Sequence, residues 1–85
     1  MRFELILPKP VRKQLEALDT VVQDRIVQEL AALLEQPRKA GVIQLTGETA
    51  FRSRVGDYRI VFEVDEVNRA LTVLNIGHRS EVYRS

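Results

Sequence analysis

The sequence contains no cysteine and only one histidine among its 85 residues. Without cysteine the chain has no disulfide, no thiolate nucleophile and no cysteine ligand for zinc, and a lone histidine cannot form a transition-metal cluster. We therefore expect no metal and no cofactor. No apolar run approaches the roughly 18 residues of a membrane-spanning helix, and the charged N-terminus does not resemble a signal peptide. These absences favour a soluble, cytoplasmic protein that does not contact the membrane.

The charge is nearly balanced overall, with a net value of +1, but it is unevenly distributed. Residues 1–36 carry five basic and six acidic side chains, whereas residues 37–85 carry eight and six. Ten of the thirteen basic residues are arginine, whose planar fork of donors matches phosphate bidentately. The chain is one small domain, 1–85, and a domain of this size buries only about 60 to 65% of its surface on folding. A bound partner would therefore add stability.

The first half of the sequence predicts one strand and two helices. Alternation of apolar residues over 2–7 predicts a strand, which Pro8 ends, and apolar positions spaced by four and three residues over 10–18 predict a short helix. Thr20 and Gln23 match a capping box, so a longer helix is expected to begin there and to stop at Gln36-Pro37. The two helices form a hairpin that covers one face of a sheet.

The second half predicts three antiparallel strands after a loop over 37–49. The strands are expected at 51–55, 58–64 and 69–77, joined by Gly56-Asp57 and by a turn over 65–68. The N-terminal strand adds to this meander. The predicted fold class is thus α+β, a four-stranded sheet with helices on one face.

Strand alternation divides the side chains of the meander between two faces. The helix-covered face is expected to hold Phe51, Val55, Tyr58, Ile60, Phe62, Val64, Leu74 and Ile76. The uncovered face is expected to hold Arg52, Arg54, Arg59, Asn75 and Arg79. His78 points away from these arginines unless a bulge follows Gly77.

The order of elements and two sequence words resemble a known superfamily. The words are Val55-Gly56-Asp57-Tyr58-Arg59-Ile60-Val61-Phe62 and Gly77-His78-Arg79-Ser80-Glu81-Val82-Tyr83. With the strand, helical hairpin and meander, they resemble the RelE/ParE superfamily of bacterial and archaeal toxins. The resemblance implies a RelE-like ribonuclease of a type II toxin–antitoxin system, which enters the ribosomal A site, cuts mRNA and is held inactive by an antitoxin protein. In such enzymes a 2′-hydroxyl attacks the adjacent phosphate and leaves 2′,3′-cyclic phosphate and 5′-hydroxyl ends.

The resemblance also assigns roles to residues of this chain. It places phosphate binding at Arg52 and Arg54, further phosphate contact at Arg59, stabilisation or protonation of the leaving oxygen at Arg79, and a catalytic tyrosine at Tyr83. The best-known members carry lysine at the positions of Arg52 and Arg54. A guanidinium with a pKa above about 12 binds phosphate but is a poor proton acceptor. The general base is therefore Tyr83 or His78, and strand alternation ranks Tyr83 first.

Other interpretations stay open from the sequence alone. Arg52 and Arg54 also suit strand-edge charges that discourage aggregation, and Arg59 also suits an ion pair with Glu63 or Glu81. Tyr83 also suits a hydrophobic lid or an antitoxin contact. For the whole chain, the alternatives are a ParE-like inhibitor of DNA gyrase without nuclease activity and a non-catalytic domain that binds nucleic acid or a peptide.

Overall fold

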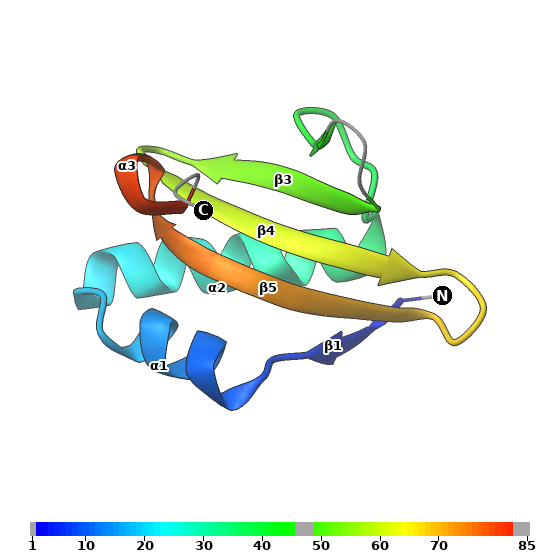
Figure 1. Ribbon diagram of the computed structural model, residues 1–85, viewed down its shortest axis with the longest axis horizontal. Coiled ribbons are helices and arrows are strands. Elements are labelled where there is room, and N and C mark those ends of the chain that lie inside the picture. The colour runs from blue at the N-terminus through cyan, green and yellow to red at the C-terminus, as the bar shows by residue number, and fades with distance from the viewer. Residues whose placement is uncertain (1, 46–48, 83–85) are drawn as a thin grey trace.

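A computed structural model describes residues 2–45 and 49–82 and shows a sheet covered by two helices (Figure 1). The elements follow the order β1 (Glu4–Ile6), α1 (Lys9–Glu16), α2 (Thr20–Glu35), β2 (Ile43–Gln44), β3 (Ala50–Val55), β4 (Tyr58–Asp65), β5 (Ala70–His78) and α3 (Arg79–Val82). The predicted α+β class and the meander of β3, β4 and β5 are confirmed. The sheet has five strands rather than the four expected, in the order β1-β5-β4-β3-β2, and β1 runs parallel to β5.

Local signals explain where the two long helices begin and end. Pro10 lies in the first turn of α1, where its missing N–H leaves no bond unmade. The predicted cap of α2 is shifted by one residue: Asp19, not Thr20, accepts the backbone N–H of Val22, at 3.1 Å. Gln23 does not close a capping box, because its amide donates to the carbonyls of Glu16 and Leu18. The helix ends at Glu35, as the following Gln-Pro pair predicts.

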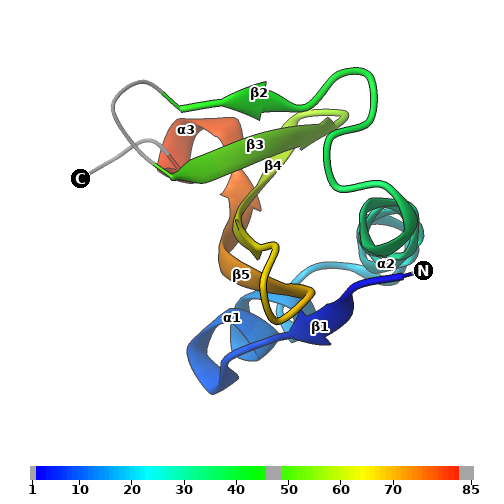
Figure 2. The same ribbon diagram turned by 90° about the vertical axis from the view of Figure 1, so that its right-hand side faces the viewer.

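One hydrophobic core lies between the sheet and helices α1 and α2. The side chains that are almost fully excluded from solvent come from α2, β4 and β5, and they are Ile26, Leu33, Ile60, Phe62, Leu71 and Val73. The rings of Phe51 and Phe62 stack at a centroid distance of 5.9 Å across β3 and β4. Figure 2 shows α2 on one side of these strands and the short α3 on the other. One face of the sheet is therefore free of both long helices.

The predicted orientation of Leu74 is wrong because β5 contains a bulge. Phe62 pairs with Val73 and the preceding residue Val61 pairs with Asn75, so Leu74 is the extra residue between them. Val73 and Ile76 both point into the core, whereas Leu74 is 42% exposed. Asn75 pairs with Val61 and lies on the uncovered face, as predicted. After the bulge, the residues at the end of β5 therefore follow the predicted alternation.

The β3–β4 connection is the two-residue turn predicted at Gly56-Asp57. Gly56 has a φ of +60°, a conformation that favours glycine because it has no Cβ.

Within residues 2–45 and 49–82, no helix is both long and apolar enough to cross a membrane. The same residues contain no group of three or more histidine, cysteine or acidic side chains able to hold a metal ion.

Candidate functional site

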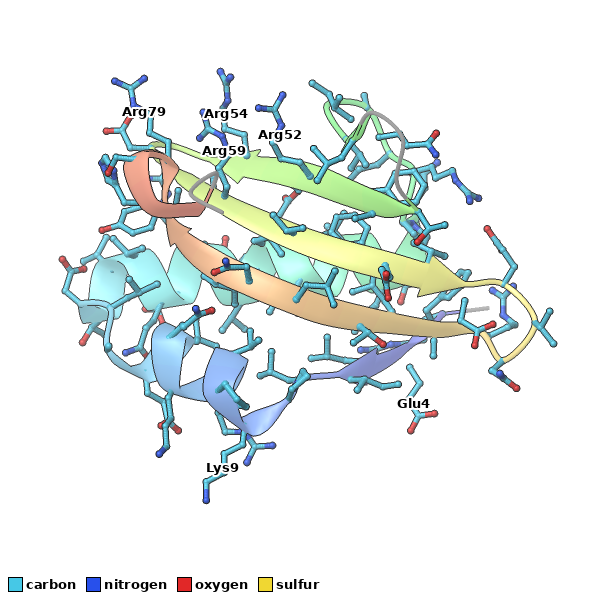
Figure 3. The ribbon with its side chains drawn as sticks, viewed as in Figure 1. Glu4, Lys9, Arg52, Arg54, Arg59 and Arg79 are labelled. Atoms are coloured by element: carbon cyan, nitrogen blue, oxygen red, sulfur yellow. The ribbon has the colours of Figure 1, made fainter. Side chains whose placement is uncertain are left out.

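Four arginines gather at the end of the sheet that carries the β3–β4 turn. Arg54 on β3 pairs directly with Arg59 on β4, and Arg52 lies two residues along β3 on the same face. Arg79 begins α3, and its backbone N–H donates to the carbonyl of Asp57 in the turn at 2.8 Å. Figure 3 shows the four labelled side chains at the same end of the sheet. The structure therefore brings together these four predicted site residues, which we call the arginine face.

Arg59 is buried although it carries a positive charge, with only 6% of its surface exposed. Its Nη1 donates to the carbonyls of Tyr58 at 3.1 Å and Gly56 at 3.4 Å, which ties the guanidinium to the turn. Its Nε is buried and finds no hydrogen-bond acceptor among the described residues. A buried donor without an acceptor is unfavourable, so an anionic oxygen placed there would stabilise the folded protein.

The arginine face holds its positive charges close together. Arg54 and Arg59 are direct cross-strand neighbours, an arrangement in which like charges repel. Between described residues, Arg54, Arg59 and Arg79 form no ion pair; the ion pairs found there involve other cations. The predicted pairing of Arg59 with Glu63 does not form, since the Glu63 carboxylate accepts the hydroxyl of Thr49 at 3.3 Å. Among the described side chains, no carboxylate therefore offsets this repulsion through an ion pair with Arg54, Arg59 or Arg79.

His78 lies on the other side of the sheet from the arginines, as strand alternation predicted. It pairs with Tyr58, and the two rings meet edge to face at 5.6 Å on the helix-covered side. The backbone N–H of Ser80 donates to Nδ1 of His78 at 3.3 Å, which holds the ring against the start of α3. The structure does not bring this imidazole to the arginines. Tyr83 and the side chain of Glu81 lie outside the described residues.

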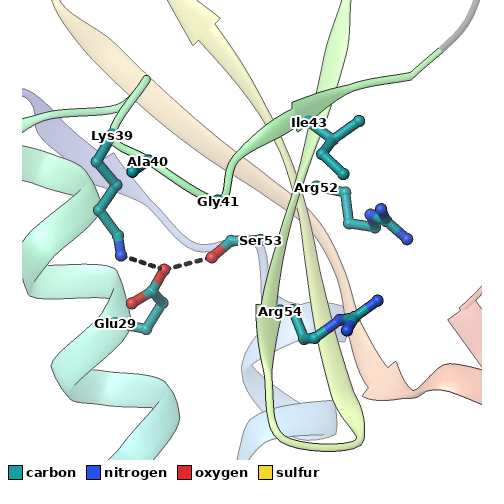
Figure 4. Close-up of a pocket in the computed structure, with 8 residues that line it drawn as sticks. All are labelled: Glu29, Lys39, Ala40, Gly41, Ile43, Arg52, Ser53 and Arg54. Atoms are coloured by element: carbon teal, nitrogen blue, oxygen red, sulfur yellow. Dashed lines mark hydrogen bonds and ion pairs between the residues drawn. The ribbon is translucent and has the colours of Figure 1, made fainter.

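A polar cluster behind β3 was missed by the sequence analysis. Ser53, between Arg52 and Arg54 but facing α2, is hydrogen-bonded to the Glu29 carboxylate, which also pairs with Lys39 at 3.1 Å (Figure 4). These residues border a pocket of about 340 Å³ at the outer edge of β3. The signal was present in the sequence, because a serine interrupts the apolar alternation of Phe51 and Val55.

The five-stranded mixed sheet, the two helices on one face and the arginines on the other define a RelE/ParE-type toxin fold. The family model for the ParE toxin of the type II toxin–antitoxin system, parDE, matches residues 5–83. The chain belongs to this family, within the RelE/ParE superfamily, and is a toxin of a type II toxin–antitoxin system.

Solved structures of RelE-type toxins share this fold. A free-state mutant of Escherichia coli toxin RelE has a TM-score of 0.82 and 23% identity, covering 98% of this chain and 92% of that one. The toxin in an archaeal RelE–RelB complex from Pyrococcus horikoshii OT3 has a TM-score of 0.81 and 26% identity, covering 96% and 100%. A chain of the toxin–antitoxin complex RelBE2 from Mycobacterium tuberculosis has a TM-score of 0.81 and 20% identity, covering 93% of this chain and 100% of that one. A search of curated proteins gave no match.

Proposed function

We propose that this toxin is a ribosome-dependent endoribonuclease that cuts mRNA in the A site. The observation that carries the proposal is Arg59, a buried cation whose Nε–H has no acceptor among the described residues, placed directly opposite Arg54. Such a pair is costly in the free protein and is stabilised by a phosphodiester. Because charge on the phosphate oxygens increases in the pentavalent transition state, the same donors favour cleavage over mere binding.

The proposed reaction needs one proton acceptor and one proton donor. The 2′-hydroxyl loses its proton and attacks phosphorus, the bond from phosphorus to the 5′-oxygen breaks, and that oxygen gains a proton. Arg52, Arg54 and Arg59 hold the phosphate, and Arg79 stabilises or protonates the leaving 5′-oxygen. His78 is on the helix-covered side, which favours Tyr83 as the acceptor of the first proton. The products are 2′,3′-cyclic phosphate and 5′-hydroxyl ends.

Mapping RNA ends tests this proposal. Purified toxin is added to translating ribosomes, and cleavage within the A-site codon with cyclic phosphate ends is expected. Arg59→Ala or Arg79→Ala should lower the cleavage rate by about 100-fold or more, as for loss of a charge-stabilising group. Arg12→Ala, an exposed cation on α1, is the matched control and should cleave like the wild type. Wild-type cleavage by both Arg59→Ala and Arg79→Ala would contradict the proposed site.

A second candidate function is inhibition of DNA gyrase, and the match to the ParE family model favours it. This candidate predicts intact mRNA together with loss of gyrase supercoiling when the purified toxin is present. The two assays, run on the same preparation, separate the functions. The arginine face supports the nuclease, because a gyrase inhibitor without nuclease activity does not need buried phosphate-binding donors.

We also propose that a cognate antitoxin protein binds this chain and suppresses its activity. The support is the family itself and the toxin–antitoxin complexes among the similar structures. Val21 and Val27 on α2 are 70% and 51% exposed, and they offer apolar surface to such a partner. Expression of the toxin alone is expected to arrest growth, and co-expression with the protein encoded beside it should restore growth. Arrest that persists with the neighbour present would contradict this pairing.

A further inference from the structure

The polar cluster behind β3 is unusual because it lies on the side of the strand that faces the core. Ser53 is 2% exposed, and among the described residues the only other buried polar or charged residue is Arg59, at 6%. Its neighbours on that face of the strand are Phe51 and Val55, which pack in the core. A buried hydroxyl is tolerated only when it is hydrogen-bonded, and here the partner is the carboxylate of Glu29 on α2.

The same carboxylate oxygen of Glu29 receives two donors from different parts of the chain. Besides the Ser53 hydroxyl, Lys39 Nζ lies 3.1 Å away, from the segment that follows α2 (Figure 4). The Glu29 and Lys39 side chains are only 16% and 30% exposed, so this pair is shielded from water more than the other ion pairs of the described residues. Helix α2, the segment after it and β3 therefore meet at one carboxylate.

The position of β3 in the sheet makes such an anchor valuable. Within residues 2–45 and 49–82, β2 is the only strand beyond β3, and it pairs with Phe51 and Arg52 without extending to residues 53–55. The two-residue Gly56-Asp57 turn sets the register of β3 against β4, but it does not set the distance between β3 and helix α2. The Ser53–Glu29 hydrogen bond joins the two elements directly. Because a hydrogen bond depends on distance and angle, it holds β3 in one position against α2.

We propose that Glu29 is a positioning residue: through Ser53 it fixes β3 so that Arg52 and Arg54 project from the arginine face beside Arg59. Two guanidinium groups bind one phosphate with good geometry only when the backbone positions of both arginines are held to within about 0.5 Å. Such precision requires contacts that support the strand from behind. The proposal rests on the proposed nuclease function for its catalytic readout. It also makes a claim about RNA binding that holds without cleavage.

The catalytic test uses Ser53→Ala, which removes the hydroxyl, and Ser53→Thr, which keeps it on a residue suited to strands. Single-turnover cleavage on ribosomes by Ser53→Ala is expected to be about 10-fold slower at saturation, a loss typical of misplaced catalytic groups. Ser53→Thr should restore most of the rate. Glu29→Gln keeps an acceptor for Ser53 but loses the ion pair, and should fall between the two.

Two controls separate positioning from loss of stability. Glu35→Gln, an exposed carboxylate of the same helix, should behave like the wild type. Ile26→Val weakens the core beneath α2 without touching Ser53, and should leave the cleavage rate of the folded protein unchanged. If Ser53→Ala cleaves at the wild-type rate, or if Ile26→Val slows cleavage as much as Ser53→Ala does, the positioning role is overturned.

A binding arm keeps the test independent of the nuclease proposal. Short RNA with 2′-O-methyl groups cannot be cleaved, and its affinity is measured by fluorescence anisotropy. Ser53→Ala is expected to weaken binding by about 3- to 10-fold, part of the loss seen on removing a phosphate contact. If the wild type does not cleave mRNA but Ser53→Ala still weakens RNA binding, the nuclease proposal fails and the positioning role stands. Equal RNA affinity of the wild type and Ser53→Ala overturns the positioning role.

Discussion

Replacing Arg59 by methionine should separate the stability of the protein from its activity. The side chain loses hydrogen bonds to Tyr58 and Gly56 at 3.1 and 3.4 Å, which contribute about 0.5 to 1.5 kcal/mol each. It also loses a buried Nε–H that has no acceptor within residues 2–45 and 49–82, unfavourable by about 1 to 3 kcal/mol. Removing repulsion from Arg54 contributes a further gain of about 0.2 to 1 kcal/mol. The unfolding free energy of Arg59→Met should therefore fall by no more than about 2 kcal/mol or rise by up to about 3 kcal/mol.

Cleavage should change far more than stability. A loss of about 100-fold in rate corresponds to about 2.7 kcal/mol of transition-state stabilisation, while the variant remains folded. Urea unfolding, with and without sulfate, measures the unfolding free energy. Sulfate should stabilise the wild type more than Arg59→Met, because only the wild type keeps the full anion site. Single-turnover cleavage on ribosomes measures the cleavage rate, with Arg12→Met, a substitution at an exposed arginine, as the control.

The opposite result would identify Arg59 as a structural clamp of the β3–β4 turn. In that case Arg59→Met would lower the unfolding free energy by more than about 3 kcal/mol, beyond the loss expected from its two hydrogen bonds. Sulfate would stabilise the wild type and the variant equally. The remaining cleavage would also follow the folded fraction as urea is added. This combination would refute the assignment of Arg59 to phosphate.

Three further predictions concern the fold. Phe62→Ala should lower the unfolding free energy measured in urea by about 3 to 5 kcal/mol, because the ring is fully buried and stacked; a loss below about 1 kcal/mol would contradict the described core. Asp19→Ala should cost about 1 kcal/mol and Thr20→Ala clearly less, whereas the reverse order would contradict the assigned cap. Hydrogen bonds from Asn68 lower the pKa of Asp65 below its usual 3.8, so its contribution to stability is complete above that pH and is lost as pH falls through the folded-state pKa. In NMR titration, Asn68→Ala should raise this pKa, and an unchanged midpoint would exclude the proposed cause.

The fold was predictable where local patterns were long and regular. The apolar spacing of α2 and the alternation of β4 are such patterns, and the two-residue turn at Gly56-Asp57 fixed the hairpin between β3 and β4. Strand β2 escaped prediction because two residues carry no period. Leu74 was misplaced because counting by two fails at a bulge, whose position depends on pairing with β4 rather than on the sequence of β5.

The sequence predicted which side of the sheet the candidate site residues occupy, but not their burial or their supporting contacts. Alternation placed Arg52, Arg54 and Arg59 together and His78 apart, and the register confirms both. The burial of Arg59 could not be foreseen, since it depends on the tertiary packing around the turn at the end where α3 meets β4 and β5. The support from Glu29 was also missed, because it joins residues far apart in the sequence and no periodicity reports such a contact.

The parallel pairing of β1 with β5 has a consequence for the synthesis of this toxin. Strand β1 can form its pairing only after β5 has been made, and β5 also supplies Leu71, Val73 and Ile76 to the core. Pairings between distant segments form late and slow folding, and domains fold as their residues leave the ribosome. Arg79 follows β5 directly, so the arginine face is assembled only after β5 has been made. A nascent chain that lacks β5 therefore has neither the complete core nor the complete arginine face.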